Sequence, residues 1–193
     1  MENLMSLELI EYQDREWYKA KDIIKLLSLS ENNVSNILGK YIPEKYKVLY
    51  HNGTVEFWVL DKLGIGYLLL ESLAEVAINI KTQLIYETIP FIIVDDFYEL
   101  GVNLPEFDGN TWYKAKGCIE KLDYAVNNVT NIVSRYVETE NKQKYFDGNK
   151  EYWLLNQIGL AKLILQSKSA YSIKVKDNLC QNYIPELIEN VLL

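Results

Sequence analysis

The segment WYKAK occurs twice in this chain, at residues 17–21 and again at residues 112–116. From these two points the sequence continues in parallel to Pro90 and Pro185, with a constant offset of 95 positions and no insertion or deletion. Of the 74 aligned pairs, 28 are identical. An ungapped match of this extent indicates an internal duplication, so we expect two tandem copies of one unit.

The two expected units cover residues 1–90 and 91–193, and residues 91–111 are expected to form a leading strand and a connector. A chain of 193 residues can hold two domains of this size, each with a small core. The longest apolar run, residues 63–70, contains two glycines and is too short to span a bilayer. Because no basic segment followed by an apolar one opens the chain, we expect an intracellular protein that is not secreted and has no membrane partner.

Each repeat is predicted to have an α+β fold in the order β-β-α-α-β-β-α-α. Asn52-Gly53 lies between two strand-like runs, and both residues tolerate the positive φ that a tight hairpin needs. Asp61 and its counterpart Asn156 can each cap the helix that follows. In the first repeat the expected elements are the strands 7–12, 17–19, 46–50 and 54–60, the helices 20–27 and 31–38, a helix that begins after Asp61, and a helix at 74–88.

Several predictions concern single positions in this pattern. Gly39 suits the C-terminal end of the second helix. Gly64 and Gly66 lie inside the third helix, where close packing explains them better than ligand binding. Proline disfavours helical geometry in the residue before it, so the fourth helix is expected to end before Pro90. The apolar run Phe91–Val94 is then expected to be the first strand of the second unit.

The sequence gives little support for catalysis or metal binding. His51 is the only histidine, and the second repeat has Phe146 in its place, which weakens it as a general base or metal ligand. No Cys/His cluster has zinc spacing, and no glycine-rich phosphate loop is present. Cys118 and Cys180 occupy isoleucine positions of the first repeat, which favours buried hydrophobes over a disulfide or redox site. We expect a non-enzyme with no cofactor and no metal.

Three blocks carry a family resemblance: WYKAKDI at residues 17–23, NQIGLAKLILQSK at residues 156–168, and a hydrophobic residue before proline at Ile89-Pro90 and Ile184-Pro185. They are similar to segments of the Bro-N domain, which is found in proteins of large DNA viruses and in phage antirepressors. As two tandem copies, the resemblance covers nearly the whole chain. It implies DNA binding for viral or phage gene regulation, in the cytoplasm or nucleus of a host cell.

The distribution of charge favours the second repeat as the part that binds nucleic acid. The whole chain has a net charge of −7, which argues against a generic polyanion binder. Residues 17–90 hold 8 Lys and Arg against 8 Asp and Glu, whereas residues 112–185 hold 11 against 7. We therefore expect an electropositive second repeat within an acidic protein; ordinary solvated lysines would give the same count, so both interpretations stay open.

The two short helices after each WYKAK resemble a helix-turn-helix, in which the second helix enters the major groove. Asparagine can pair with adenine, and arginine with guanine or phosphate. Asparagines at helix starts also act as caps, so both interpretations stay open. The expected reading residues are Asn127, Asn128, Thr130, Asn131 and Arg135. The expected phosphate contacts are Lys114, Lys116, Lys142, Lys144, Lys150, Lys168, Lys174 and Lys176.

A second function competes with DNA binding. The 15 tyrosines and the acidic net charge favour a non-catalytic protein-interaction module, antirepressor-like or an acidic decoy, that binds a host or repressor protein. Trp58, Trp153, Tyr50 and Tyr145 could stack bases or lie in the core. The chain is expected to be a monomer with pseudo-dimeric repeats or a homodimer.

Overall fold

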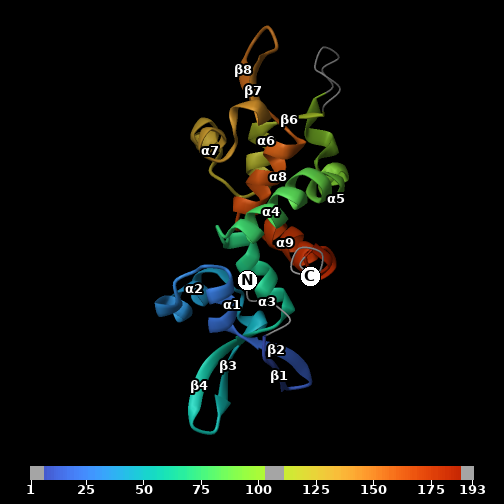
Figure 1. Cartoon of the computed structure of the whole chain (residues 1–193). Helices are drawn as coiled ribbons and strands as arrows, with labels where there is room; N and C mark the ends of the chain where they lie inside the picture. The colour runs from blue at the N-terminus through green and yellow to red at the C-terminus, as the bar shows by residue number, and fades with distance from the viewer. Residues whose placement is uncertain (1–6, 103–110, 188–193) are drawn as a thin grey trace. The chain divides into compact units, whose positions relative to one another are not determined.

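The computed structural model describes residues 7–102 and 111–187 (Figure 1). Its contacts divide the chain into two compact units, called here the first unit and the second unit. The first unit consists of residues 1–82 and 176–193, and the second unit consists of residues 83–175. The division predicted after residue 90 follows the repeat in the sequence, whereas these compact units follow packing.

The first unit contains a four-stranded antiparallel sheet in the order β1-β2-β4-β3. The hairpin predicted between β3 and β4 is confirmed, but its two turn residues are Gly53 and Thr54: Gly53 has φ of +63°, whereas Asn52 belongs to β3, pairs with Val55 and has no positive φ. The strands are β1 (Leu9–Tyr12), β2 (Arg15–Lys19), β3 (Lys47–Asn52) and β4 (Val55–Leu60). The helices are α1 (Ala20–Leu26), η2 (Glu31–Asn33), α2 (Val34–Tyr41), η3 (Glu44–Tyr46), α3 (Lys62–Glu71) and α4 (Glu75–Gln83).

The second unit contains a four-stranded antiparallel sheet in the order β5-β6-β8-β7, so the α+β class is confirmed. Its strands are β5 (Gly101–Val102), β6 (Trp112–Lys114), β7 (Lys142–Phe146) and β8 (Glu151–Asn156). Its helical segments are η4 (Leu84–Thr88), α5 (Ile89–Phe97), η5 (Tyr98–Leu100), α6 (Ala115–Lys121), η6 (Val126–Asn128), α7 (Val129–Tyr136), η7 (Thr139–Asn141), α8 (Gln157–Gln166) and α9 (Ala170–Asn182), which continues into the first unit.

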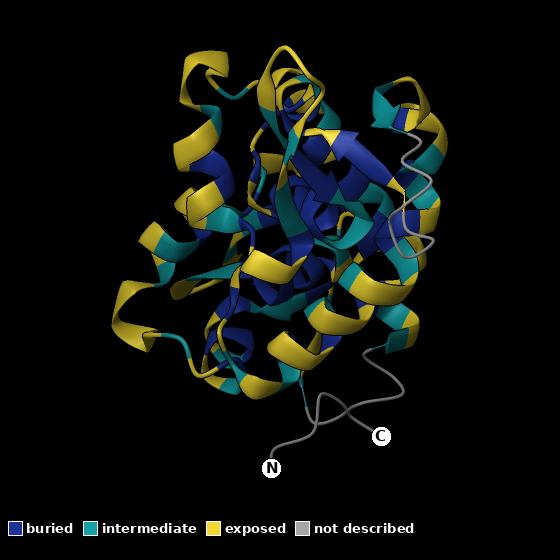
Figure 2. Ribbon diagram, turned by 90° about the horizontal axis from the view of Figure 1, so that it is seen from above, coloured by how far each residue is buried: buried dark blue, intermediate teal, exposed yellow. Residues whose placement is uncertain are grey.

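Several helices have both buried and exposed residues (Figure 2), whereas α3 is buried at every residue from Gly64 to Leu70. In α1, Ala20, Ile23 and Ile24 are fully buried. This helix ends in a Schellman motif, in which Ser28 adopts φ of +53° and the next residue bonds back to the carbonyl of Ile24. In α6 the same motif places Asp123 at φ of +55°. The motif fixes the turn into the following helix in each unit.

Capping of the third helix is confirmed in both units. The Asp61 carboxylate accepts a hydrogen bond from the Gly64 N–H at 2.9 Å, and the Asn156 amide oxygen accepts one from the Gly159 N–H at 2.8 Å. The prediction for Gly39 is wrong, because α2 continues to Tyr41 and this glycine lies inside the helix. Residues 31–33 form a separate 3₁₀ turn instead of the start of one longer helix.

The strand predicted at Phe91–Val94 is wrong, because these residues belong to helix α5. Pro90 lies in the first turn of α5, directly after the π-helical segment η4. Ile89, Ile93 and Phe97 are fully buried, and their spacing of four residues is helical. The helix predicted to end before Pro90 is likewise wrong, since the π-helical segment η4 leads directly into α5.

Residues from the end of the chain complete the first unit. The carboxylate of Asp177 accepts hydrogen bonds from Tyr67 Oη at 2.7 Å, Tyr46 Oη at 3.0 Å and Lys45 Nζ at 3.1 Å. A Cβ placed on Gly66 would lie 2.8 Å from the Sγ atom of Cys180. The last helix of the second repeat therefore packs tightly against α3 of the first unit.

The contacts of Asp177 predict a pH-dependent contribution to stability. Burial alone would raise the pKa of Asp177, but hydrogen bonds from Tyr67, Lys45 and Tyr46 outweigh it and hold the pKa below its usual range. A depressed pKa stabilises the fold above the unfolded value of about 4, and this stability is lost as the pH falls through the folded pKa. Asp177→Asn is therefore expected to cost about 1–2 kcal/mol at pH 7 and progressively less below about pH 4 in urea unfolding.

Asp95→Asn provides the control for this variant, because Asp95 is an exposed acid of α5. It is expected to change the free energy of unfolding by less than about 0.5 kcal/mol at any pH. An Asp177→Asn difference that stays constant from neutral to acid pH would contradict the assigned role of the carboxylate.

No single helix among the described residues is long and apolar enough to cross a membrane. One pair of helical segments, Lys62–Glu71 and Glu75–Leu100, passes the same test of length and composition when taken together, with a bend of 95° between its members.

Candidate nucleic-acid interface

The second unit presents the predicted reading residues on one short helix. Asn128, Asn131 and Arg135 follow an i, i+3, i+7 spacing, which places them on one face of α7 and its first turn. All three are exposed, whereas Ile132 and Val133 are buried on the opposite side. The face is therefore open to a ligand along its length.

The polar residues of this face contact each other and their neighbours. Asn131 Nδ2 donates to Asn128 Oδ1, and Asn128 makes no side-chain capping bond. The guanidinium of Arg135 lies 5.2 Å from the ring centroid of Tyr136. Asn127 is exposed in η6. Side-chain capping therefore does not explain the asparagine at the start of α7.

The hairpin β7–β8 is attached to α7 by a side-chain hydrogen bond. Trp153 Nε1 donates to Thr130 Oγ1 at 3.3 Å, and Trp58 Nε1 donates to Ser35 Oγ at 3.2 Å at the equivalent positions of the first unit. Lys144 lies 5.5 Å from the centroid of Trp153 and pairs with the Glu151 carboxylate at 2.6 Å. Helix and hairpin thus form one composite surface.

Lys142 has a structural position. Its ammonium donates to the carbonyls of Val133 and Val137 at the C-terminal end of α7. In the first unit Lys47 does the same with Leu38 and Ile42, at 3.0 and 2.9 Å, and is almost fully buried. The two lysines therefore stabilise helix ends. Because the Lys142 ammonium already donates to these carbonyls, Lys142 is a poor candidate for a phosphate contact.

The other predicted lysines differ in their exposure and contacts. Lys114 is exposed at the end of β6 and lies 5.9 Å from the ring centroid of Tyr152. Lys116, Lys168 and Lys174 are exposed and form no ion pair with any residue that the structure describes. Lys176 is buried, lies 3.9 Å from a Glu71 carboxylate oxygen and belongs to the first unit.

Several cations of the first unit form ion pairs with acids. Lys19 pairs with Glu8 at 3.0 Å, and Lys21 pairs with Glu31 at 3.7 Å. The second repeat has Val126 at the position of Glu31, so Lys116 has no equivalent of that carboxylate. The further ion pairs of the first unit are Arg15–Asp61, Lys45–Asp177, Lys47–Glu44 and Lys62–Glu16. In the second unit, Lys144 and Lys162 are also paired with acids, Glu151 and Glu138, at 2.6 Å each.

The described residues offer no metal centre: no group of three or more His, Cys, Asp or Glu side chains among them could hold a metal ion. Cys118 and Cys180 are free and buried. Burial raises the pKa of Cys118 to about 12 and raises that of Cys180 as well, so both thiols stay protonated near neutral pH. His51 is exposed and lies 2.9 Å from a Glu56 carboxylate oxygen.

Residues 102–185 match the model of the BRO family, N-terminal domain. A Bro-N domain is thus detected over this part of the chain. This Bro-N domain begins at the end of β5, runs through α9 and includes every predicted reading residue and phosphate contact. No curated protein and no solved structure matched the chain.

Sequence reasoning missed two contacts that shape the face of the Bro-N domain, Trp153 with Thr130 and Lys114 with Tyr152. A signal for the first was present in the sequence. The tryptophan and a hydroxyl residue stand 23 positions apart in both repeats, as Ser35 with Trp58 and Thr130 with Trp153. A repeated pair of donor and acceptor at constant separation favours a direct contact over chance.

Proposed function

We propose that this protein is a viral or phage DNA-binding regulatory protein built from two Bro-N-like repeats, in which the second repeat makes most of the contacts with DNA. The Bro-N domain at residues 102–185 carries the proposal, because this family indicates a DNA-binding regulatory role and not an enzymatic one. The proposed repeats cover residues 1–90 and 91–193.

The proposal of a second Bro-N-like copy rests on sequence and structure together. The 28 identities over 74 ungapped pairs favour a common origin of the two repeats. Both sheets have equivalent strand orders. In both units a tryptophan N–H of the hairpin donates a hydrogen bond to a hydroxyl group of the neighbouring helix. Features of this detail support two copies of one fold.

The proposed DNA contact uses α7 and the hairpin β7–β8. Asn128, Asn131 and Arg135 would face base edges in the major groove, and the attached hairpin would lie along the backbone. Thr130 and Asn127 extend the same polar surface. The proposed phosphate contacts are Lys114, Lys116, Lys144, Lys150, Lys168 and Lys174.

A fluorescence-anisotropy titration of the intact protein with mixed-sequence duplex DNA tests this function. We expect binding at low salt that weakens steeply as salt rises, because each neutralised phosphate releases about 0.9 of a counterion. Absence of binding at low salt would overturn the proposal. Binding that does not change with salt would also overturn it, since phosphate contacts require counterion release.

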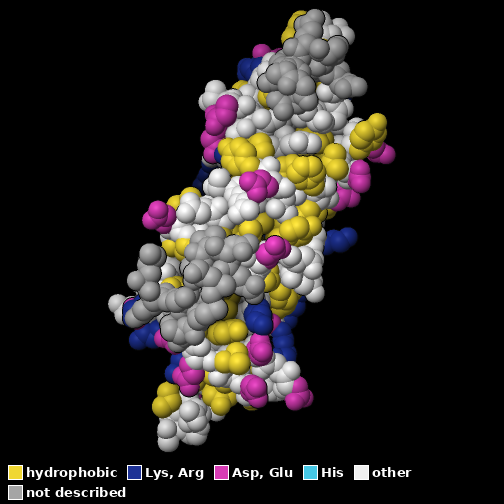
Figure 3. All heavy atoms as spheres, turned by 45° about the vertical axis from the view of Figure 1, so that its right-hand side comes forward, with side chains coloured by type: hydrophobic (Ala, Val, Ile, Leu, Met, Phe, Trp, Pro, Cys, Tyr) yellow, Lys and Arg dark blue, Asp and Glu magenta, His cyan; other side chains and the backbone are white. Residues whose placement is uncertain are grey.

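A specific surface favours a non-catalytic protein-interaction module as the second candidate. Phe91 and Tyr98 are seven residues apart on one helical segment and are 77% and 79% exposed. Asp95 and Glu99 are exposed on the same segment. Figure 3 shows such hydrophobic and acidic side chains close together on the surface. A host or repressor protein with a basic apolar face would suit this surface, and failure of the DNA titration would favour it.

A further inference from the structure

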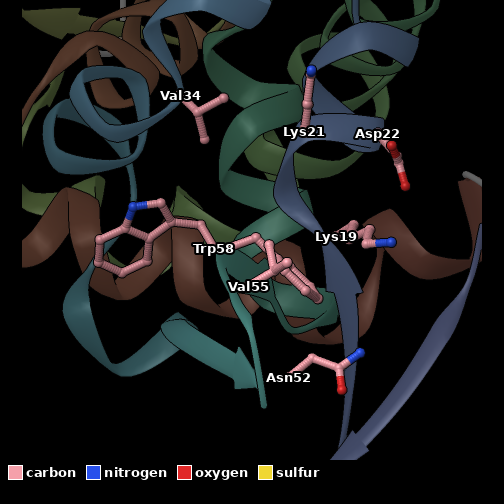
Figure 4. A pocket seen from close by; sticks show the side chains of 8 residues that line it. Lys19, Lys21, Asp22, Val34, Asn52, Val55 and Trp58 are labelled. Carbon is pink, nitrogen blue, oxygen red and sulfur yellow. The ribbon is translucent and has the colours of Figure 1, made fainter.

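Strand β3 is an edge strand of the first unit's sheet, because the strand order places only β4 beside it. No strand that the structure describes lies on its other side. The inner strand β4, by contrast, pairs with β3 and also with β2 at Lys19, and Lys21 and Asp22 line a cleft beside it (Figure 4). Of the two strands of this hairpin, β3 is therefore the one that a further strand could join.

The backbone groups on the outer side of β3 belong to alternate residues. At the end of the β3–β4 ladder, the Asp61 N–H donates to the Tyr46 carbonyl. Because hydrogen bonding alternates along an antiparallel strand, the even-numbered residues of β3 bond to β4 and the odd-numbered ones face outward. Leu49 and His51 are exposed, whereas Lys47 is only 5% exposed. The accessible edge therefore offers the N–H and C=O groups of Leu49 and His51.

This edge lacks the features that protect edge strands from pairing with another chain, such as charged residues, proline or a very short length. The other described edge strands have them: β1 contains Glu11, β5 has two residues, and β7 contains the exposed Lys144. From Val48 to Asn52, β3 has no Lys, Arg, Asp, Glu or Pro. At the position of Lys144 the first repeat has Leu49, which is 38% exposed. The first repeat thus leaves open an edge that the second repeat protects.

We propose that β3 pairs with β3 of a second copy of this chain, antiparallel and around a twofold axis. Exposure and hydrogen bonding select one register, in which Leu49 of each copy bonds with His51 of the other copy and Tyr50 stands opposite Tyr50 at the axis. A register with Leu49 opposite Leu49 would instead place His51 against the buried Lys47. This interface goes beyond the proposed DNA contact, because it lies in the first unit and takes a protein partner.

The side chains of this register suit a second copy of the same strand. An aromatic pair directly opposite in a sheet contributes about 0.2–1 kcal/mol. The Tyr50 ring is positioned by Tyr12 and Phe57, with ring centroids 5.3 and 5.4 Å away, so the pairing extends this aromatic cluster. Since Val48–Asn52 contains no Lys, Arg, Asp or Glu, no two such side chains of like charge stand opposite each other. A second copy supplies, by symmetry, a strand with the same open edge.

Sedimentation equilibrium of the full-length protein without DNA tests the proposal. Because the paired strands are short and the interface is small, we expect a weak dimer with a Kd between about 1 μM and 1 mM. Leu49→Lys, which gives β3 the residue that β7 has, is expected to weaken the dimer at least about tenfold. A protein that stays monomeric up to about 1 mM would overturn the second copy as the partner and would favour an extended segment of another protein.

Leu73→Lys is the matched control. Leu73 is 80% exposed in the first unit and lies outside the sheet, and the second repeat has Lys168 in its place. Both variants replace an exposed leucine by the lysine that the second repeat has at that position, so both should fold. Leu73→Lys should leave the Kd of the dimer unchanged. Equal weakening by the two variants, or no weakening by Leu49→Lys, would overturn the assignment of the interface to β3.

Cysteine cross-linking tests the register. Opposed residues of a pair without hydrogen bonds have Cα atoms about 4.5 Å apart, which suits a disulfide. Tyr50→Cys should therefore give a disulfide-linked dimer on mild oxidation. Asn52→Cys should not, because the two copies of residue 52 would lie four positions apart, at about 13 Å along the strand. The native cysteines Cys118 and Cys180 are buried and should not interfere. Any other pattern of linkage would overturn this register.

Discussion

Alanine at Gly64 or at Gly159 is expected to lower the free energy of unfolding by about 1–3 kcal/mol. A Cβ on Gly64 would lie 2.6 Å from the carbonyl oxygen of Tyr46, and a Cβ on Gly159 would lie 2.6 Å from that of Asn141. These neighbours are backbone atoms, so no side-chain rotation can relieve the contact. In the first unit the Tyr46 carbonyl also accepts the Asp61 N–H, which holds it in place.

Gly39→Ala is the matched control, because a Cβ at Gly39 would meet no atom within 4 Å. This glycine lies inside α2 and is exposed, so alanine there is expected to raise the free energy of unfolding by about 0.5–1 kcal/mol. Urea unfolding followed by circular dichroism measures all three variants. If Gly64→Ala and Gly39→Ala shift the midpoint in the same direction, the close approach of α3 to η3 does not limit stability.

Part of the fold could be predicted from the sequence because it depends on local contacts. The hairpin at Gly53 and the caps Asp61 and Asn156 depend on residues within a few positions of each other. Local hydrogen bonds and steric limits decide such features. Because the sequence is repeated, each of these local features is expected in both repeats.

The wrong sequence predictions concern segments whose local pattern fits more than one structure. Other contacts were not predicted because the partner residues lie far apart in sequence. Phe91–Val94 is a short apolar run that fits a strand or a buried helix, and its packing decides for α5. Asp177 binds Tyr46 and Tyr67, which lie 131 and 110 residues away. No spacing rule within one repeat predicts that the end of the chain completes the first unit.

For the candidate site, the sequence identified residue types but not their surroundings. Lys142 and Lys116 look equivalent in a count of charges. In the structure the Lys142 ammonium donates hydrogen bonds to carbonyls at the end of α7, whereas Lys116 is exposed to solvent. Whether a lysine ammonium can contact a ligand depends on the residues that surround it in the fold. The replacement of Glu31 by Val126 matters because Glu31 pairs with Lys21 in the first unit, and this pair is known only from the structure.

Removal of two of these available charges is expected to have the largest effect on DNA binding. The double variant Lys116→Ala, Arg135→Ala should weaken duplex binding at low salt by about tenfold or more. Both side chains are exposed, so the variant should fold normally. The slope of log K against log salt should flatten by roughly 1.8, because about 0.9 of a counterion is released for each phosphate contact.

The double variant Lys40→Ala, Lys62→Ala removes the same amount of charge from the first unit. Lys40 stands at the position of Arg135 in the repeat, and Lys62 pairs with Glu16 at 2.7 Å. If DNA contacts lie on the second unit, this control should keep the salt slope of the unaltered protein. Equal loss of affinity and slope in both double variants would show that net charge alone governs binding, and the assignment of the interface to α7 and its neighbours would then fail.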